Sequence, residues 1–207
     1  MEFRKASSEN EFILLKKLKN CPRVIRVIDY DYNGILTIEK ADRDLLDFIQ
    51  SQSSMTEPQL FCIVEQIVDA LSSIHRHHIY HLDLKLENVV LVNGSIKLID
   101  FGMSQESYND TCSGYQGTPG NQRHGNIPRE VVDWKELNEV LGDEVSYSGE
   151  KVDVYALGQL IQNIIDMLHI IPKKSLTDML QKMKVVSRFR YTIRQVIDSS
   201  WFQSKGT

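Results

Sequence analysis

Two polar segments separated by a predicted hairpin constrain this chain more than any other feature. The first segment ends with Asn88, and the second begins with Asp100. Residues 89–92 and 96–99 are rich in β-branched side chains and flank Asn93-Gly94, a strong signal for a tight hairpin turn. Because the two ends of a hairpin meet, we expect Asn88 and Asp100 to lie side by side.

The side chains of these segments suit the transfer of a phosphoryl group. Amide and carboxylate oxygens, such as those of Asn88 and Asp100, are hard ligands that Mg²⁺ prefers. Asp83 and Lys85 lie two residues apart on one loop, so both can face the same side. A carboxylate there can accept a hydroxyl proton while an ammonium group neutralises the phosphoryl group. We therefore predict Asp83 and Lys85 as catalytic residues and Asn88 and Asp100 as metal ligands.

The same segments resemble the eukaryotic protein kinase family, whose catalytic loop has the pattern H-R-D-L-x-x-x-N and whose metal loop has D-F-G. The chain has His81-Leu82-Asp83-Leu84 with Asn88, followed by Asp100-Phe101-Gly102. Lys85 is similar to the lysine of the serine/threonine branch. The resemblance covers residues 8–202 approximately. It implies an α+β, protein-kinase-like fold with a mainly helical large lobe and a reduced small lobe.

Roles for individual residues follow from this resemblance. It implies ATP and Mg²⁺ as cofactors, with Asp83 as the catalytic base and Lys85 in contact with the γ-phosphate. Asn88 and Asp100 would hold Mg²⁺. The backbone of the hinge between the lobes, at Glu39 and Ala41, would bind adenine. Val90 would form the apolar floor beneath it.

Further positions resemble structural contacts of the family. His81 and Phe101 would stack behind the site, and Asp153 would brace the catalytic loop. Glu130 and Arg190 would form a buried ion pair, whose disruption typically costs about 3–5 kcal/mol. Thr118, in the segment 117–120, would contact the catalytic aspartate and lysine.

Local patterns predict a small lobe over residues 1–41 and a large lobe over residues 42–207. Ser8 can cap a helix, with Glu11 placed as in a capping box. The resemblance makes Glu11 the partner of a strand lysine, but capping alone explains it equally well. A helix and a hairpin are predicted in this part of the chain: residues 8–19, 24–28 and 35–39.

The large lobe is predicted to be mainly helical. An apolar stripe with spacings of three and four predicts a core helix that starts after Thr56 and runs to Ile74. Residues 103–126 lack periodicity and are typical of a functional or disordered loop. Three further helices are predicted: residues 153–168, 175–183 and 192–199.

The small lobe departs from the family pattern. Neither a G-x-G-x-x-G loop nor a V-A-I-K strand precedes Glu11. Lys5 lies only six residues before Glu11, and we interpret this spacing as too short for the lysine that contacts ATP phosphates. We therefore expect the first three small-lobe strands to be absent and nucleotide binding to be weaker.

Leu82 stands where the family has an arginine that receives an activation-loop phosphate. We infer that phosphorylation is not needed to order this loop in the usual way. This inference holds although the loop contains three candidate acceptors: Ser107, Thr111 and Ser113.

Composition narrows the location and the partners. The net charge of -4 gives no reason to expect nucleic acid or a membrane as a partner. No apolar run approaches the ~20 residues of a membrane span. Three cysteines without CxxC spacing predict reduced thiols in an intracellular protein, in the cytoplasm or nucleus. Four histidines are better explained by a helix end and a stacked core residue than by a zinc site: His75, His77, His78 and His81.

Three interpretations of function remain. In the first, the chain is an ATP- and Mg²⁺-dependent kinase that acts on serine or threonine of a protein substrate. Alternatively, it is a weak or inactive pseudokinase that binds and regulates another kinase or signalling protein. The third interpretation is a fragment or short isoform of a longer kinase.

Overall fold

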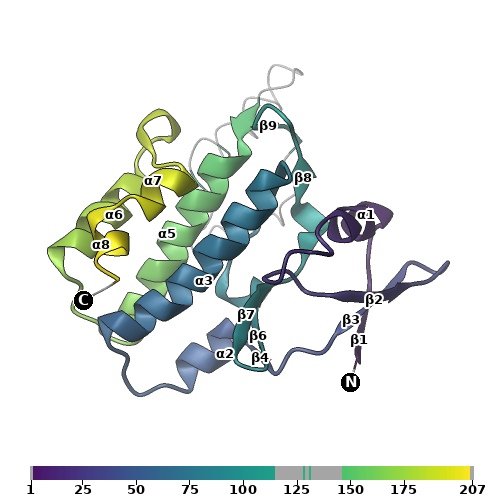
Figure 1. Ribbon diagram of the computed structural model, residues 1–207, viewed down its shortest axis with the longest axis horizontal. Coiled ribbons are helices and arrows are strands. Elements are labelled where there is room, and N and C mark those ends of the chain that lie inside the picture. The colour runs from purple at the N-terminus through teal and green to yellow at the C-terminus, as the bar shows by residue number, and fades with distance from the viewer. Residues whose placement is uncertain (1, 115–127, 129–130, 132–145, 206–207) are drawn as a thin grey trace.

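The computed structural model describes residues 2–114, 128, 131 and 146–205, whose elements form two lobes (Figure 1). We call β1, α1, β2 and β3 the small lobe, and the elements from β4 onward the large lobe. This arrangement of small sheets and a mainly helical body confirms the predicted α+β class. The domain boundary between residues 41 and 42 stays a prediction.

The small lobe is an antiparallel sheet with one helix beside it. Its strands β1 (Glu2–Ala6), β2 (Val27–Tyr30) and β3 (Ile35–Glu39) lie in the order β1-β3-β2. Helix α1 (Glu9–Lys17) begins where the sequence predicts it, because the Oγ of its N-cap Ser8 accepts a hydrogen bond from a backbone N–H of the first turn.

The expectation that all three leading strands of the small lobe are absent is wrong for one of them. Strand β1 pairs with β3 along its whole length, with Lys5 opposite Leu36. Its polar residues are largely exposed, so it lacks the apolar alternation that marks a half-buried strand. Strand β2 begins at Val27 rather than at residue 24, since Val24 forms a bridge with Leu98 of the large lobe instead.

Two long helices form the centre of the large lobe. Helix α3 (Glu57–Arg76) starts at the predicted Thr56 cap, where Thr56 and Gln59 form a reciprocal capping box. Helix α5 (Gly149–Met167) begins before the predicted residue 153, because Ser148 caps it. Both helices are buried along one side, which confirms the predicted core stripe of α3. Shorter helices pack around them: α2 (Leu45–Gln50), α6 (Lys174–Lys184), α7 (Ile193–Ile197) and α8 (Ser200–Gln203).

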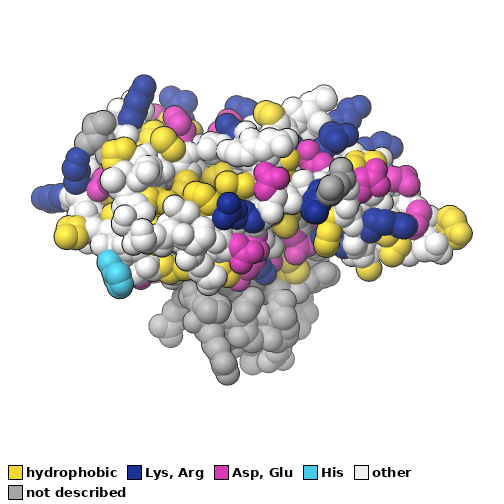
Figure 2. Space-filling model, turned by 90° about the horizontal axis from the view of Figure 1, so that it is seen from below, with side chains coloured by type: hydrophobic (Ala, Val, Ile, Leu, Met, Phe, Trp, Pro, Cys, Tyr) yellow, Lys and Arg dark blue, Asp and Glu magenta, His cyan; other side chains and the backbone are white. Residues whose placement is uncertain are grey.

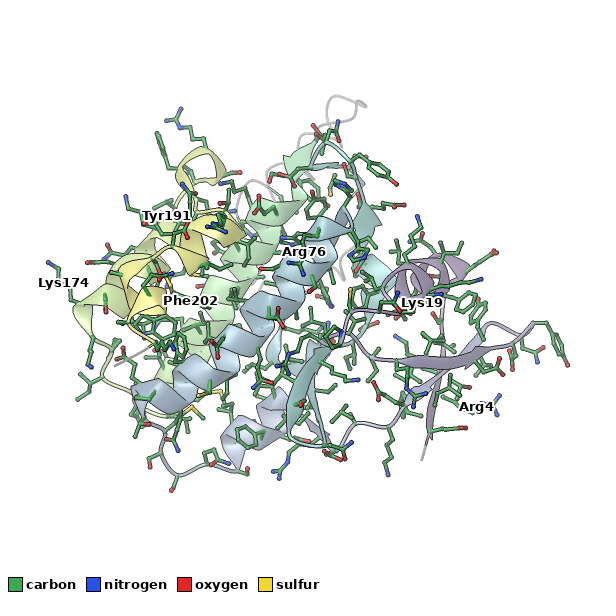
Figure 3. The ribbon with its side chains drawn as sticks, viewed as in Figure 1. Arg4, Lys19, Arg76, Lys174, Tyr191 and Phe202 are labelled. Carbon is green, nitrogen blue, oxygen red and sulfur yellow. The ribbon has the colours of Figure 1, made fainter. Side chains whose placement is uncertain are left out.

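Aromatic side chains close the large lobe at its C-terminal end. Trp201 is fully buried, and its Nε1 donates a hydrogen bond to Glu57 at 2.7 Å. The ring of Phe61 lies 5.3 Å from those of both Trp201 and Phe202, the latter labelled in Figure 3. Burial of one such side chain contributes about 1.5–3 kcal/mol. These contacts attach α8 firmly to α3.

The predicted hairpin is present and joins the two lobes. Strands β6 (Val89–Val92) and β7 (Ser95–Leu98) pair antiparallel around a turn in which both Asn93 and Gly94 have positive φ. Strand β4 (Arg43–Asp44) lies on the other side of β6. The N–H of Ile25 donates to Leu98 O at 3.0 Å, so the strand β7 also holds the small lobe.

Short elements organise the chain around the hairpin. Among the described residues, three segments are 3₁₀ helices: η1 (Leu86–Asn88), η2 (Phe101–Met103) and η4 (Ser187–Phe189). Two small sheets pair β5 (Ile79–Tyr80) with β8 (Gln105–Glu106), and β9 (Thr111–Cys112) with β10 (Tyr147–Ser148). The predicted loop 103–126 therefore contains β8 and β9, and its part from residue 115 onward lies outside the described residues.

The surface is of mixed charge on the face seen from below, where Lys and Arg side chains are interspersed with Asp and Glu side chains around a hydrophobic band (Figure 2). Over the described residues, the helices are too short or too polar to cross a membrane.

Candidate functional site

A cleft of about 340 Å³ lies between the two lobes. The small lobe contributes strands β1 and β3 and helix α1, and the large lobe contributes the β6–β7 hairpin and the start of α2. Four of the predicted cofactor-binding residues line it: Glu39, Ala41, Val90 and Asp100. The two carboxyl-terminal ends of β3 and β7 therefore meet at one cavity, although they are far apart in the sequence.

Lys5 lines the cleft, and its contacts there are ones that the sequence interpretation missed. Its Nζ lies 2.8 Å from Glu11 Oε1 and 2.8 Å from Asp100 Oδ1. The neighbouring Arg4 points away from the large lobe and contacts Asp31 instead (Figure 3). This alternation is the normal consequence of β-strand geometry.

The spacing of six residues was interpreted above as too short for a strand lysine, but it permits the contact between Lys5 and Glu11. The strand ends at Ala6 and the helix begins at Glu9, so the chain reverses within two residues. Glu11 then lies in the first helical turn, beside the strand that carries Lys5. A lysine preceding a Ser-capped helix was the signal that could have revealed this pair.

The contacts of the Glu11 carboxylate differ from those of a helix cap. It is almost fully buried, and its Oε1 also accepts the backbone N–H of Phe101 at 3.0 Å. Its Oε2 accepts a hydrogen bond from Ser7 Oγ at 2.6 Å. Glu11 thus joins the lysine strand, helix α1 and the start of η2, which favours the pairing role over the capping role.

Electrostatics keep both partners of the Lys5–Asp100 pair charged. Burial by itself lowers the pKa of Lys5, but hydrogen bonds to Asp100 and Glu11 outweigh this effect, so the pKa is raised. Burial by itself raises the pKa of Asp100, but the hydrogen bond from Lys5 and its charge prevail, so that pKa is lowered. The cleft therefore presents an ammonium group beside an ionised carboxylate.

Asp83, Lys85 and Asn88 form a compact cluster on the loop before β6. Lys85 Nζ lies 2.8 Å from Asp83 Oδ2, and the amide nitrogen of Asn88 donates to the same oxygen at 2.8 Å. That nitrogen also donates to Asp83 O at 2.8 Å. The amide oxygen of Asn88 is consequently turned away from Asp83 and is the atom that can bind a cation.

The backbone of this loop is held from beneath by Asp153 on α5. Its two carboxylate oxygens accept the N–H groups of His81 and Leu82, each at 2.8 Å. Leu82 has a φ of 62°, a costly conformation for a branched residue, which the two hydrogen bonds help to maintain. Asp153 also pairs with His75 Nε2 at 2.8 Å, and is fully buried.

The two polar segments are also joined by a contact between two rings, whose planes are tilted by 56° to each other. The centroids of His81 and Phe101 lie 5.0 Å apart, as the resemblance implied. His81 Nε2 lies 3.0 Å from Ile99 O. Asp100, which follows Ile99, has a φ of 63°, and this left-handed turn directs its carboxylate toward Lys5.

Residues 117–120, with Thr118, and the predicted partner Glu130 lie outside the described residues. Arg190 itself is buried, and its guanidinium donates to Val185 O and Lys151 O. Its predicted ion pair with Glu130 stays a prediction.

Comparison with known proteins supplies independent findings. A family model described as "Protein kinase domain" matches residues 2–202. The chain is 26% identical to the "Carbon catabolite-derepressing protein kinase" of Candida glabrata in an alignment of 222 residues, gaps included, that covers 94% of this chain and 34% of that protein. It is 27% identical to the "Dual specificity protein kinase Ttk" of Danio rerio in an alignment of 228 residues, gaps included, that covers 95% of this chain and 23% of the relative. It is 30% identical to the "Serine/threonine-protein kinase ppk6" of Schizosaccharomyces pombe over 155 residues, 72% of this chain and 18% of the relative.

Thus the chain spans about a third or less of the length of these curated relatives.

Proposed function

The chain belongs to the protein kinase family, and on that premise we propose that it transfers the γ-phosphoryl group of ATP to serine or threonine hydroxyls of a protein substrate. The observation that carries this proposal is the placement of Lys5. It meets Glu11 and Asp100 at the cleft, although its spacing in the sequence argues against such a role. A lysine, two acidic residues and the Asp83 cluster are together the groups that phosphoryl transfer uses.

Asp83 is the proposed base. Its Oδ2 is held by Lys85 and Asn88, so the carboxylate has a defined orientation from which it can accept the proton of a substrate hydroxyl. Lys85 lies within 2.8 Å of it and supplies positive charge where the phosphoryl group arrives. Asp153 fixes the loop, which keeps both groups in place.

Lys5 is the proposed second cation for ATP phosphates. Its ammonium group is already positioned by Glu11, so binding of phosphate requires only that its contact with Asp100 be exchanged. Glu39 and Ala41 would face adenine through their backbone, and the side chain of Val90 would lie beneath the ring.

The donor set fits Mg²⁺. Asp100 offers a carboxylate that is ionised because its pKa is lowered, and Asn88 offers an amide oxygen. These are hard oxygen donors, and Mg²⁺ commonly uses one or two protein ligands together with phosphate oxygens. When bound, the ion neutralises charge on the phosphates, while Asp100 and Asn88 hold it against the hairpin.

The test is incubation of the purified protein with labelled ATP, Mg²⁺ and generic protein substrates. The variants Asp83→Asn and Asp100→Asn should lose transfer by about a hundredfold or more. The matched control is Asp178→Asn, which should retain transfer activity because Asp178 lies exposed on α6. Transfer that persists unchanged in Asp83→Asn would refute the proposed base.

A non-catalytic binding module is the second candidate. Strand β1 is at the edge of its sheet, and Phe3 is 54% exposed while lining the cleft. An exposed aromatic on a sheet edge suits a protein partner that covers it. Absence of transfer, together with no rise in melting temperature upon addition of Mg-ATP, would favour this candidate.

For either function we retain a cytoplasmic or nuclear location, which the free cysteines Cys21, Cys62 and Cys112 support.

A further inference from the structure

The segment of residues 103–114, which begins at the last residue of η2, is attached to the large lobe at two places. Its strand β8 pairs with β5, which leads into the catalytic loop, and its strand β9 pairs with β10, which leads into α5. Figure 1 shows β8 and β9 beside the adjoining ends of α3 and α5. The turn between these strands contains Asp110.

Asp110 binds the beginning of α5 with both of its carboxylate oxygens. Oδ1 accepts the backbone N–H of Glu150 at 2.8 Å, and Oδ2 accepts a hydrogen bond from Ser148 Oγ. Burial raises the pKa of Tyr80, and the negative charge of Asp110 raises it further. Asp110 has a φ of 56°, which aspartate tolerates better than most side chains.

The first turn of α5 transmits this contact to the catalytic loop. Ser148 is the N-cap of the helix, and its Oγ also accepts the N–H of Lys151 at 3.1 Å. A carboxylate beside the N-terminus of a helix is favourable because of the unpaired N–H groups and the helix dipole. Asp153 lies three residues after Glu150, and it holds the N–H groups of His81 and Leu82.

A small apolar cluster is packed tightly against the start of α5. Gly149 has no room for a side chain, because an added Cβ would lie 2.4 Å from Tyr80 Cγ and 2.8 Å from Cys112 Sγ. Leu82, at the position where the resembled pattern has arginine, is only 4% exposed. The cluster consists of Tyr80, Leu82, Cys112, Val131, Tyr147 and Val152.

We propose that Asp110 is a positioning residue, a permanent carboxylate that clasps residues 103–114 to the start of α5 and thereby sets the catalytic loop without phosphorylation of this segment. The part of this proposal that concerns catalysis rests on the proposed function. The chemistry is that of an anion at a helix N-terminus, supplied by the chain itself. The hydroxyls of Ser107 and Thr111 are already engaged within the turn. Ser107 Oγ contacts Asn109 Oδ1 and the backbone of Thr111, and Thr111 Oγ1 donates to Asn109 O. A phosphate on either of them would disturb the turn that presents Asp110.

A second contact on the same segment points the same way. Glu106 Oε2 lies 2.5 Å from Lys17 Nζ, at the last turn of α1. The hydrogen bond from Lys17 lowers the pKa of Glu106. Residues 103–114 thus engage both lobes through their own carboxylates, Glu106 toward α1 and Asp110 toward α5.

The experiment compares the unmutated protein with Asp110→Asn, which has the same shape but lacks the charge. Asp178→Asn is the control, since it removes the same charge from the exposed side of α6. Hydrogen exchange of the unliganded protein is followed by mass spectrometry in peptides that cover residues 79–84 and 147–153. We expect exchange in both peptides to become about tenfold faster in Asp110→Asn only, as for loss of a charge-assisted hydrogen bond.

Kinetics give the second readout. In the label-transfer assay, Asp110→Asn should lower kcat about tenfold and leave the KM for ATP within twofold, because the residues proposed to face adenine lie on β3, just after it, and on β6. Treatment of the unmutated protein with a phosphatase should leave kcat unchanged. If Asp110→Asn fails to fold, Ser148→Ala removes the partner of the same hydrogen bond and is measured in its place.

The outcomes separate the two proposals. Unchanged exchange in residues 79–84, or loss of activity on phosphatase treatment, overturns the clasp. If the unmutated protein transfers no label, the proposed function fails, but the exchange result still decides whether Asp110 sets the loop.

Discussion

Replacement of Lys5 by methionine tests the assembly of the cleft most directly. The side chain keeps nearly its length and loses its charge, so Glu11 and Asp100 lose their shared cation. Removal of one partner from a buried pair typically costs about 3–5 kcal/mol. Lys5 is 25% exposed and Asp100 is 46% exposed, so water takes over part of the lost interaction. Glu11, at 4% exposure, receives little such help. We therefore expect Lys5→Met to lower the free energy of unfolding by about 1–3 kcal/mol.

The loss should depend on pH in a defined direction. The pKa of Lys5 is raised above its usual 10.5, so its contribution is complete below pH 10.5 and is lost as the pH rises through the higher folded value. The pKa of Asp100 is lowered below its usual 3.8, so its contribution is present above pH 3.8 and is lost as the pH falls through the lower folded value. The difference between the two proteins should thus be constant from about pH 5 to pH 10 and shrink outside this window.

Urea unfolding at several pH values measures this difference. Lys19→Met is the matched control, because Lys19 is exposed on the same lobe (Figure 3) and the change removes the same charge. In a transfer assay Lys5→Met should reduce activity about a hundredfold. A stability within 0.3 kcal/mol (about the error of such a comparison) of the unmutated protein, or an equal loss in Lys19→Met, would refute the reasoning.

Three further changes test other parts of the structure. Gly149→Ala should lower the free energy of unfolding in urea by about 1–3 kcal/mol, because the new methyl group would overlap Tyr80; unchanged stability would contradict the close approach. Asp153→Asn should lower it by about 3–5 kcal/mol, since a buried carboxylate holds two backbone amides of the catalytic loop; a loss under 1 kcal/mol would argue against this bracing role. Lys97→Met should raise the KM for ATP several-fold with little change in kcat, since Lys97 hydrogen-bonds to Glu39 at the cleft. Burial by itself raises the pKa of Glu39, but the hydrogen bond from Lys97 outweighs it, so the pKa is lowered. A matching fall in kcat would instead place Lys97 in the chemical step.

Local sequence determined the elements whose causes are local. The Asn93-Gly94 turn specified the hairpin because both residues tolerate positive φ, and Ser8 and Thr56 marked helix starts because their hydroxyls accept orphan N–H groups. The stripe of α3 predicted a core helix for the same kind of reason, since helical periodicity alone decides which side is buried.

The sequence could not reveal the meaning of residues whose partners are far away. Strand β1 has no apolar alternation, and it exists because β3 offers a complementary edge. The sequence offers only the spacing of Lys5, whereas the contacts of Lys5 depend on a chain reversal and on a carboxylate of the large lobe. Asp110 has an ordinary turn composition, and only the packing of residues 103–114 against α5 gives its charge a specific partner.

The sequence by itself thus determined the family and the hairpin, and it predicted the cluster of Asp83, Lys85 and Asn88, because these depend on side-chain chemistry at short spacing. The tertiary structure alone decided that Lys5 meets Glu11 and Asp100 at the cleft. It also decided that Asp110 attaches residues 103–114 to the start of α5. Those contacts join residues brought together by folding, and their electrostatic energies depend on distance and burial, which no local pattern encodes.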